Sequence, residues 1–197
     1  AWSERGLYER EFTLPQTWFS QRVFLVFEGA MTDTSAKLNG ESVGPPHQGG
    51  FYRFQYDVTT FLKYGETNKL EVAVAKHSAN ESVNRAERQA DYWVFGGIFR
   101  PVYLEAVPPQ FIERVAIDAR ADGAFAMDAF LNGVGSADSV EAQILSPNGK
   151  SVGAPFQQRL SGNKTTLQTK VSSPQQWTAE TPNLYFVEVR LKQGGKV

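Results

Sequence analysis

The sequence contains no cysteine and only two histidines in 197 residues. The absence of cysteine excludes disulfide bonds, thiolate metal sites and cysteine nucleophiles, but it leaves the redox compartment open. His47 and His77 lie far apart along the chain. A metal centre built from several histidines is therefore not expected.

The chain also lacks an excess of charge of either sign and any long apolar run. Lys and Arg number 20 against 21 Asp and Glu, which gives a formal net charge of −1. Without a basic block to neutralise phosphates, we expect neither nucleic acid nor an anionic membrane as a partner. No run approaches the roughly 18 apolar residues that span a bilayer. We also identify no cleavable signal peptide in the opening residues.

The dominant hydrophobic period is two, which is typical of β-strands. Residues 21–28 are mostly apolar and rich in branched and aromatic side chains, as in a strand buried on both faces. Residues 70–76 and 102–106 alternate between apolar and polar side chains. No pattern long enough for a standard amphipathic helix is present, so the sequence predicts an all-β protein.

Turn signals divide these strands. Asn39-Gly40, between apolar residues, predicts a tight β-hairpin. Asp57 precedes a stretch that ends at Gly65, which predicts an Asp-capped helical turn. Residues 78–90 are polar and of mixed charge, and we interpret them as a long loop beside His77.

Two prolines near residue 108 mark a domain boundary, because proline ends a strand ladder and stiffens a linker. Residues 1–108 fit a jelly-roll sandwich of the galactose-binding kind, and residues 109–197 fit an immunoglobulin-like β-sandwich. Strands of the second domain are predicted at residues 111–120, 125–131, 139–145, 165–171 and 184–191. Residues 192–195 form a turn signal with little sequence after it, so we expect this domain to be truncated at its C-terminal end.

The most informative segment is residues 91–104, DYWVFGGIFRPVYL. It joins an acidic residue, two large aromatic rings and a glycine pair to an alternating strand, a combination that suits a sugar site at the rim of a sheet. The segment resembles the signature that closes the N-terminal sugar-binding domain of glycoside hydrolase family 2, the β-galactosidase and β-glucuronidase group. Other segments resemble that family in the same order: residues 6–12, 22–29, 38–40, 51–59 and 177–185.

The resemblance implies a retaining glycosidase whose two catalytic glutamates lie on a (β/α)₈ barrel. The sequence has no alternation of strands with long helices that would build such a barrel. We therefore expect no catalytic residue in this chain, no hydrolysis by the chain alone, and a missing barrel domain and a glycoside or oligosaccharide substrate as its partners.

The substrate-binding candidates are Asp91, Tyr92 and Trp93. The resemblance implies that Asp91 reaches the terminal sugar, partly through a sodium ion, which makes it a sodium-ligand candidate in the full enzyme. Tyr92 and Trp93 could stack on a pyranose ring or pack the loop onto the sandwich. No cofactor or metal site is otherwise expected in this chain, although a structural calcium on the jelly roll is an open alternative.

Two other functions remain open at this point. The chain could be a stand-alone carbohydrate-binding protein whose glycan site is the loop of residues 78–95, or an adhesion protein that presents immunoglobulin-like modules. By analogy with polysaccharide degraders, a periplasmic or secreted location is expected, with the cytoplasm and an oligomeric state both left open.

Overall fold

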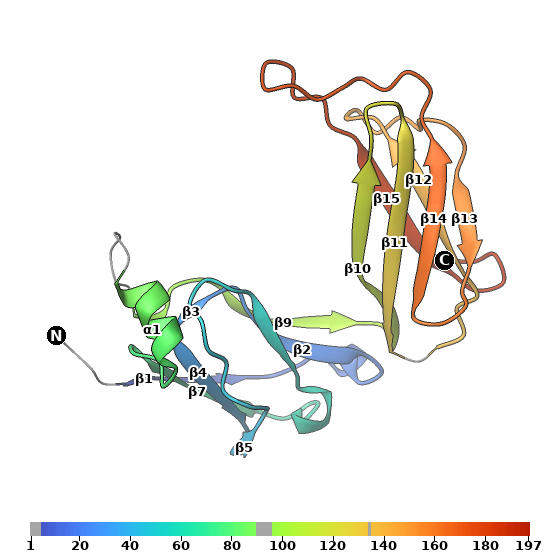
Figure 1. Cartoon of the computed structure of the whole chain (residues 1–197). Coiled ribbons are helices and arrows are strands. Elements are labelled where there is room, and N and C mark those ends of the chain that lie inside the picture. Colours follow the sequence, from blue (N-terminus) through green and yellow to red (C-terminus); the bar gives the residue numbers. More distant parts are fainter. Residues whose placement is uncertain (1–4, 90–95, 134) are drawn as a thin grey trace. The chain divides into compact units, whose positions relative to one another are not determined.

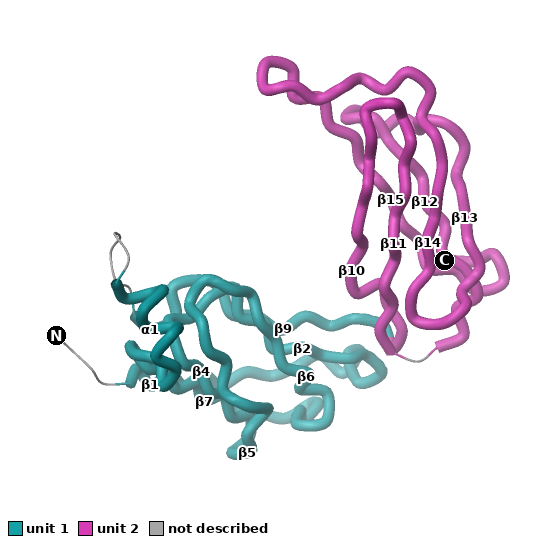
Figure 2. The backbone as a smooth tube through the Cα atoms, viewed as in Figure 1, with its two compact units in different colours: residues 1–108 teal, residues 109–197 magenta. Residues whose placement is uncertain are grey.

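The computed structural model describes residues 5–89, 96–133 and 135–197. The chain divides into two compact units, Ala1–Pro108 and Pro109–Val197 (Figure 2). Each unit has its own apolar core. The predicted all-β class, a jelly-roll sandwich followed by an immunoglobulin-like sandwich, is confirmed (Figure 1).

One sheet of unit 1 has the order β1-β7-β4-β5. Its strands are β1 (Arg5–Phe12), β7 (Asn68–Ala75), β4 (Asp33–Leu38) and β5 (Glu41–Ser42). The predicted hairpin joins β4 to β5, with φ of 54° at Asn39 and 87° at Gly40. Positive φ at both central residues is the requirement of a type I′ turn, which Asn-Gly meets with little strain.

The other main sheet of unit 1 has the order β6-β2-β9. Its strands are β6 (Phe54–Asp57), β2 (Arg22–Phe27) and β9 (Val102–Val107). Every residue of β2 after Arg22 is buried, which confirms the prediction of a strand covered on both faces. A two-stranded sheet of β3 (Ala30–Met31) and β8 (Gly97–Ile98) completes the unit.

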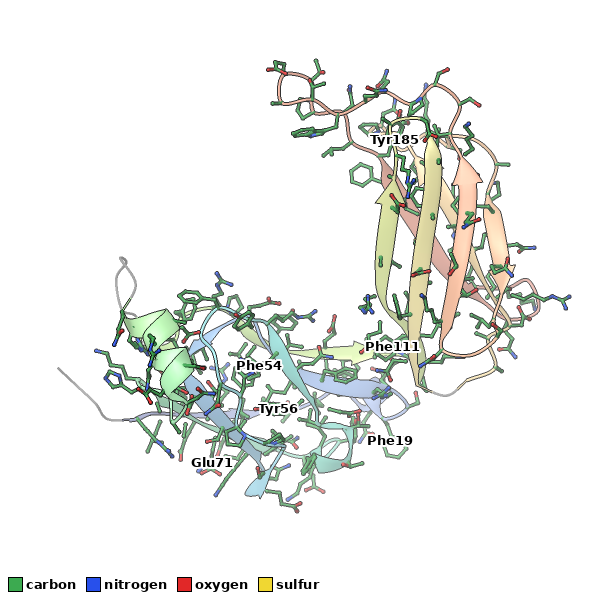
Figure 3. All side chains as sticks on the ribbon, viewed as in Figure 1. Phe19, Phe54, Tyr56, Glu71, Phe111 and Tyr185 are labelled. Atoms are coloured by element: carbon green, nitrogen blue, oxygen red, sulfur yellow. The ribbon has the colours of Figure 1, made fainter. Side chains whose placement is uncertain are left out.

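Aromatic packing fills the core of unit 1. The fully buried ring of Phe27 stacks on Phe54 at a centroid separation of 4.7 Å, and Tyr56 meets both rings edge-on (Figure 3). Burial of a ring of this size contributes roughly 1.5–3 kcal/mol. The core therefore holds β2 and β6 in a fixed position.

Short helical segments complete unit 1, at Gln16–Trp18 and Thr59–Phe61 as 3-10 turns. The Asp57 carboxylate accepts a hydrogen bond from the Thr59 backbone N–H at 3.1 Å, so the predicted helical turn begins beside Asp57, but it ends at Phe61 rather than at Gly65.

The prediction of an unstructured loop at residues 78–90 is wrong, because helix α1 spans Glu81–Arg88. Asn80 caps this helix, Glu81 occupies its first turn, and Arg85 and Arg88 lie in its last turn. These are favourable positions for the helix dipole. The helix is short and almost entirely polar, so hydrophobic periodicity could not reveal it.

Unit 2 is a sandwich of two three-stranded sheets, with orders β10-β11-β14 and β13-β12-β15. All of the predicted strands are present, and β13 is an additional one. The strands are β10 (Gln110–Ala119), β11 (Ala124–Gly133), β12 (Ser139–Leu145), β13 (Phe156–Arg159), β14 (Lys164–Lys170) and β15 (Phe186–Lys192). Their inward side chains form the second core.

Across the described ranges 5–89, 96–133 and 135–197, no helix has both the length and the apolar character that crossing a membrane requires.

Candidate functional site

The three predicted sugar contacts, Asp91, Tyr92 and Trp93, lie outside the described residues. The structure does describe both flanks of this segment. Helix α1 precedes it and strand β8 follows it. The site is therefore considered from these two flanks.

The N-terminal end of α1 is held by side-chain caps. The Asn80 carboxamide oxygen accepts a hydrogen bond from the Ser82 backbone N–H at 3.0 Å. The side chain of Asn84 accepts from the Ser78 N–H at 2.7 Å and donates to the Ser78 carbonyl at 2.6 Å. The first turn of the helix is thus joined to the segment that follows β7, and the Ser82 N–H, which has no acceptor within the helix, has a partner.

The C-terminal half of α1 is held by a buried carboxylate. Glu87 is only 6% exposed and accepts hydrogen bonds from the Gly50 backbone N–H at 2.6 Å and from the Thr32 hydroxyl at 2.9 Å. Bonds to a charged acceptor are stronger than neutral ones, and a buried charge is stable only when it is satisfied. Glu87 therefore joins α1 to two other segments of unit 1.

Three further hydrogen bonds hold the helix and the segment just before it. The Asp33 carboxylate, at the start of β4, accepts from the Ala79 N–H at 2.7 Å and from the Gln48 side chain at 3.2 Å. The guanidinium of Arg88 donates to the Lys76 carbonyl oxygen at the end of β7. Arg88, the last residue of α1, is therefore hydrogen-bonded to the end of β7. The segment that carries Asp91 follows Arg88 closely in the sequence.

On the other flank, Gly97 has a φ of +79° and lies against Tyr8 of β1. A Cβ atom at Gly97 would lie 2.1 Å from the Tyr8 hydroxyl oxygen, and the positive φ also favours glycine here. The Ile98 N–H donates to the same hydroxyl at 3.3 Å, and Ile98 also pairs with Ala30 in the β3–β8 ladder.

Two exposed aromatic rings, Phe51 and Tyr52, lie near α1, and the sequence analysis did not identify them as site residues. They are 42% and 65% exposed. Gly49 lies between the Tyr52 ring and Glu87 of α1. A Cβ atom added at Gly49 would lie 2.9 Å from the Tyr52 ring and 3.7 Å from the Glu87 carboxylate. Residues 51–59 were given only as part of the resemblance, and the fold shows that the Phe51 and Tyr52 side chains are exposed.

The histidines differ in environment. The ring of His47 stacks on Phe54 with centroids 3.8 Å apart, and its Nε2 lies 3.0 Å from the Gly49 carbonyl oxygen. Burial lowers the pKa of His47 below its ordinary value, more than the Gly49 contact and the nearby Glu87 and Asp33 carboxylates raise it. His77 is exposed.

Within the part of the chain that the structure describes, no group of three or more His, Cys, Asp or Glu side chains is placed to hold a metal ion. Asp91, which the resemblance places beside a sodium ion, lies outside that part. What the described residues provide is a rigid support. Residues 90–95 join a helix fixed by Glu87 and Arg88 to a strand fixed by Tyr8.

Comparison with known proteins agrees with this arrangement. The family model described as "Glycosyl hydrolases family 2, sugar binding domain" matches residues 2–108. The model described as "Glycosyl hydrolases family 2" matches residues 111–197. Together these matches cover both units almost completely.

Individual relatives are much longer than this chain. A β-galactosidase of Priestia megaterium is 32% identical over 200 residues, which are 95% of this chain and 19% of that protein. A β-galactosidase of Clostridium acetobutylicum is also 32% identical, over 98% of this chain and 21% of its own length. The chain thus spans about a fifth of the length of these relatives.

Solved structures also match this whole chain with only a part of a longer protein. A β-glucuronidase of Bacteroides uniformis superposes with a TM-score of 0.82 at 26% identity, over 98% of this chain and 25% of that one. A β-glucuronidase of Bifidobacterium dentium has a TM-score of 0.82 at 26% identity, over 97% and 37% of the two chains. With both units matched by its domain models, this chain belongs to glycoside hydrolase family 2.

Proposed function

We propose that this chain forms one wall of the sugar-binding cleft of a family 2 β-glycosidase whose catalytic residues lie on a separate (β/α)₈ barrel. The observation that carries the proposal is the match of both units to family 2 domains in a chain about one fifth as long as related β-galactosidases. The strand pairs of the described residues are antiparallel, whereas that barrel requires eight parallel strands. The chain then contributes binding and orientation, and the barrel contributes bond cleavage.

Asp91 is the residue proposed to contact the sugar. An ionised carboxylate accepts hydrogen bonds from sugar hydroxyls, and Tyr92 and Trp93 offer flat apolar faces to a pyranose ring. A contact of this kind orients the substrate well only when its backbone is held in place. The fixed ends of the segment, at Arg88 and Gly97, support the proposal.

A second candidate function is autonomous carbohydrate binding, which the exposed rings of Phe51 and Tyr52 favour. Exposed aromatic rings beside polar groups are a common means of binding sugars, because the ring faces cover the apolar side of a pyranose. In this case the isolated chain would bind glycans without a barrel.

Calorimetric titration of the 197-residue chain with galactose, glucuronate and β-linked disaccharides tests the two candidates. A wall that works only beside the barrel predicts no heat of binding at millimolar sugar and no hydrolysis of chromogenic β-glycosides. Saturable binding at or below roughly 1 mM, about −4 kcal/mol, that Tyr52→Ala abolishes would favour autonomous binding. Hydrolysis by the isolated chain would contradict the first proposal directly.

A further inference from the structure

Gly50 lies between the two flanks of residues 90–95. Its backbone N–H donates to the buried Glu87 carboxylate of α1 at 2.6 Å. A Cβ atom added at Gly50 would lie 2.8 Å from the Met31 Cε, so the backbone here packs directly on the Met31 side chain. Met31 pairs with Gly97 in the β3–β8 ladder, and Figure 1 shows β3 beside α1. Gly50 therefore connects the helix before residues 90–95 to the strand after them.

Two exposed rings, Phe51 and Tyr52, follow in the sequence and lie toward different flanks. The Phe51 ring meets Phe99 edge-on at a centroid separation of 6.4 Å, and Phe99 comes directly after β8. The Tyr52 ring packs on Gly49, which adjoins Glu87 of α1. We call Phe51 and Tyr52 the ring pair. It offers aromatic surface beside both supports of the candidate site.

Polar groups border the ring pair, and their charges balance. The Arg100 guanidinium lies 5.4 Å from the centre of the Phe99 ring. The Arg53 guanidinium, next to Tyr52 in the sequence, lies 3.5 Å from the Glu28 carboxylate and 3.1 Å from that of Glu105. Two guanidiniums and two carboxylates give this surface no net charge. Aromatic faces with charged donors and acceptors around them suit a neutral sugar, because its hydroxyls need partners and its ring carbons need apolar cover.

We propose that the ring pair forms a second sugar subsite, for the next unit of a β-linked oligosaccharide whose terminal sugar contacts Asp91. The inference rests on the proposed function, since it adds a contact beside that one. Residues 90–95 are only six positions long, and Gly50 touches the supports at both of their ends. The sugar next to the terminal one then stacks on the ring pair, while Arg53 and Arg100 donate to its hydroxyls. The substrate class is a neutral β-linked oligosaccharide.

Relative activity on long and short substrates tests the subsite in a polypeptide that joins this chain to a (β/α)₈ barrel domain. The measured quantity is kcat/KM for a neutral β-linked trisaccharide divided by kcat/KM for the β-glycosyl fluoride of the same terminal sugar. Fluoride is too small a leaving group to reach the rings. Phe51→Ala and Tyr52→Ala are each expected to lower this ratio by roughly 3- to 10-fold, because the trisaccharide alone loses a stacking contact.

Two matched variants control for the loss of a ring. Tyr52→Phe keeps the aromatic face and should keep the ratio of the unaltered protein. Phe19→Ala removes a ring of the same unit that is 73% exposed and lies outside the ring pair, so it should keep the ratio as well. A fall of equal size in Phe19→Ala would overturn the subsite, because the effect would then not be specific to the ring pair.

The subsite and the proposed function fail separately. Asp91→Ala is expected to lower kcat/KM for both substrates, because they share the terminal sugar. If it does so while Phe51→Ala and Tyr52→Ala leave the ratio unchanged, the subsite is overturned and the proposed function stands. If Asp91→Ala has no effect while the ring variants lower the ratio, the role of Asp91 is contradicted and the subsite is supported.

Discussion

At the scale of single residues, the candidate site depends on one residue outside any motif, Glu87, and on one inside the motif of residues 91–104, Gly97. Glu87 fixes α1 to Gly50 and Thr32, and Gly97 accommodates the Tyr8 hydroxyl. The sequence places Gly97 in the segment of residues 91–104, but its positive φ and the approach of the Tyr8 hydroxyl are seen only in the fold. Glu87 could not be identified, since its partners lie on segments that only the fold brings together.

Removing the Glu87 carboxylate is expected to destabilise unit 1. Glu87→Ala leaves the Gly50 N–H and the Thr32 hydroxyl buried without that partner, which costs about 2–4 kcal/mol of the free energy of unfolding. Urea unfolding followed by amide exchange in β4 and β7 measures the loss. Glu81→Ala on the same helix is the matched control, because Glu81 is 90% exposed and should change stability by less than about 0.5 kcal/mol. Equal losses in the two variants would contradict this role of Glu87.

His47 should make the stability of unit 1 sensitive to mild acid. Burial lowers its pKa below the ordinary 6.5, so the folded state binds fewer protons than the unfolded state. The stability that the neutral His47 side chain contributes is fully present above pH 6.5. It is lost as the pH falls through the pKa of the unfolded state toward the lower pKa of the folded state. The Tm of unit 1 is therefore expected to fall between pH 7.5 and pH 5.

The histidine variants separate this effect from other titrations. His47→Gln should remove much of the pH dependence, while His77→Gln should keep it, because His77 is exposed. A Tm profile that His47→Gln leaves unchanged between pH 5 and pH 7.5 would exclude His47 as its source.

At the scale of elements, strands were predictable and the one α-helix of the described residues was not. Period-two alternation and the Asn39-Gly40 turn located most strands, because side-chain direction in a strand follows from sequence position alone. Helix α1 has only two apolar residues, Val83 and Ala86, in its short span, too few for a recognisable periodic pattern. The local signals of the helix were the cap at Asn80 and the ion pair between Glu81 and Arg85. Each stabilises a short helix less than its contacts with the rest of the unit do.

The cap can be tested directly. Asn80→Ala removes the acceptor for the Ser82 N–H and is expected to cost about 1 kcal/mol, seen as faster amide exchange in the first turn of α1. Asn80→Asp should restore most of the protection, because a carboxylate also caps a helix. Full protection in Asn80→Ala would show that the contacts of Asn84 with Ser78 are sufficient.

At the scale of the whole molecule, each unit is a β-sandwich with its own core, and both units match family 2 domains. The resemblance of residues 91–104 and 177–185 predicted this organisation, since such motifs reflect shared ancestry as well as local physics. It could not predict that Gly50 contacts both flanks of residues 90–95, because those contacts join segments that are distant in the sequence.

We propose that Asp91 contacts sugar for chemistry performed by another domain. The direct measurement is kcat/KM for β-galactosides and β-glucuronides in a polypeptide that joins this chain to a (β/α)₈ barrel domain, with and without Asp91→Ala. Loss of a hydrogen bond to a charged group predicts a fall of roughly 10- to 100-fold. Glu66→Ala, an exposed acidic residue of the same unit, is expected to leave it unchanged. An unaltered kcat/KM in Asp91→Ala would contradict the account.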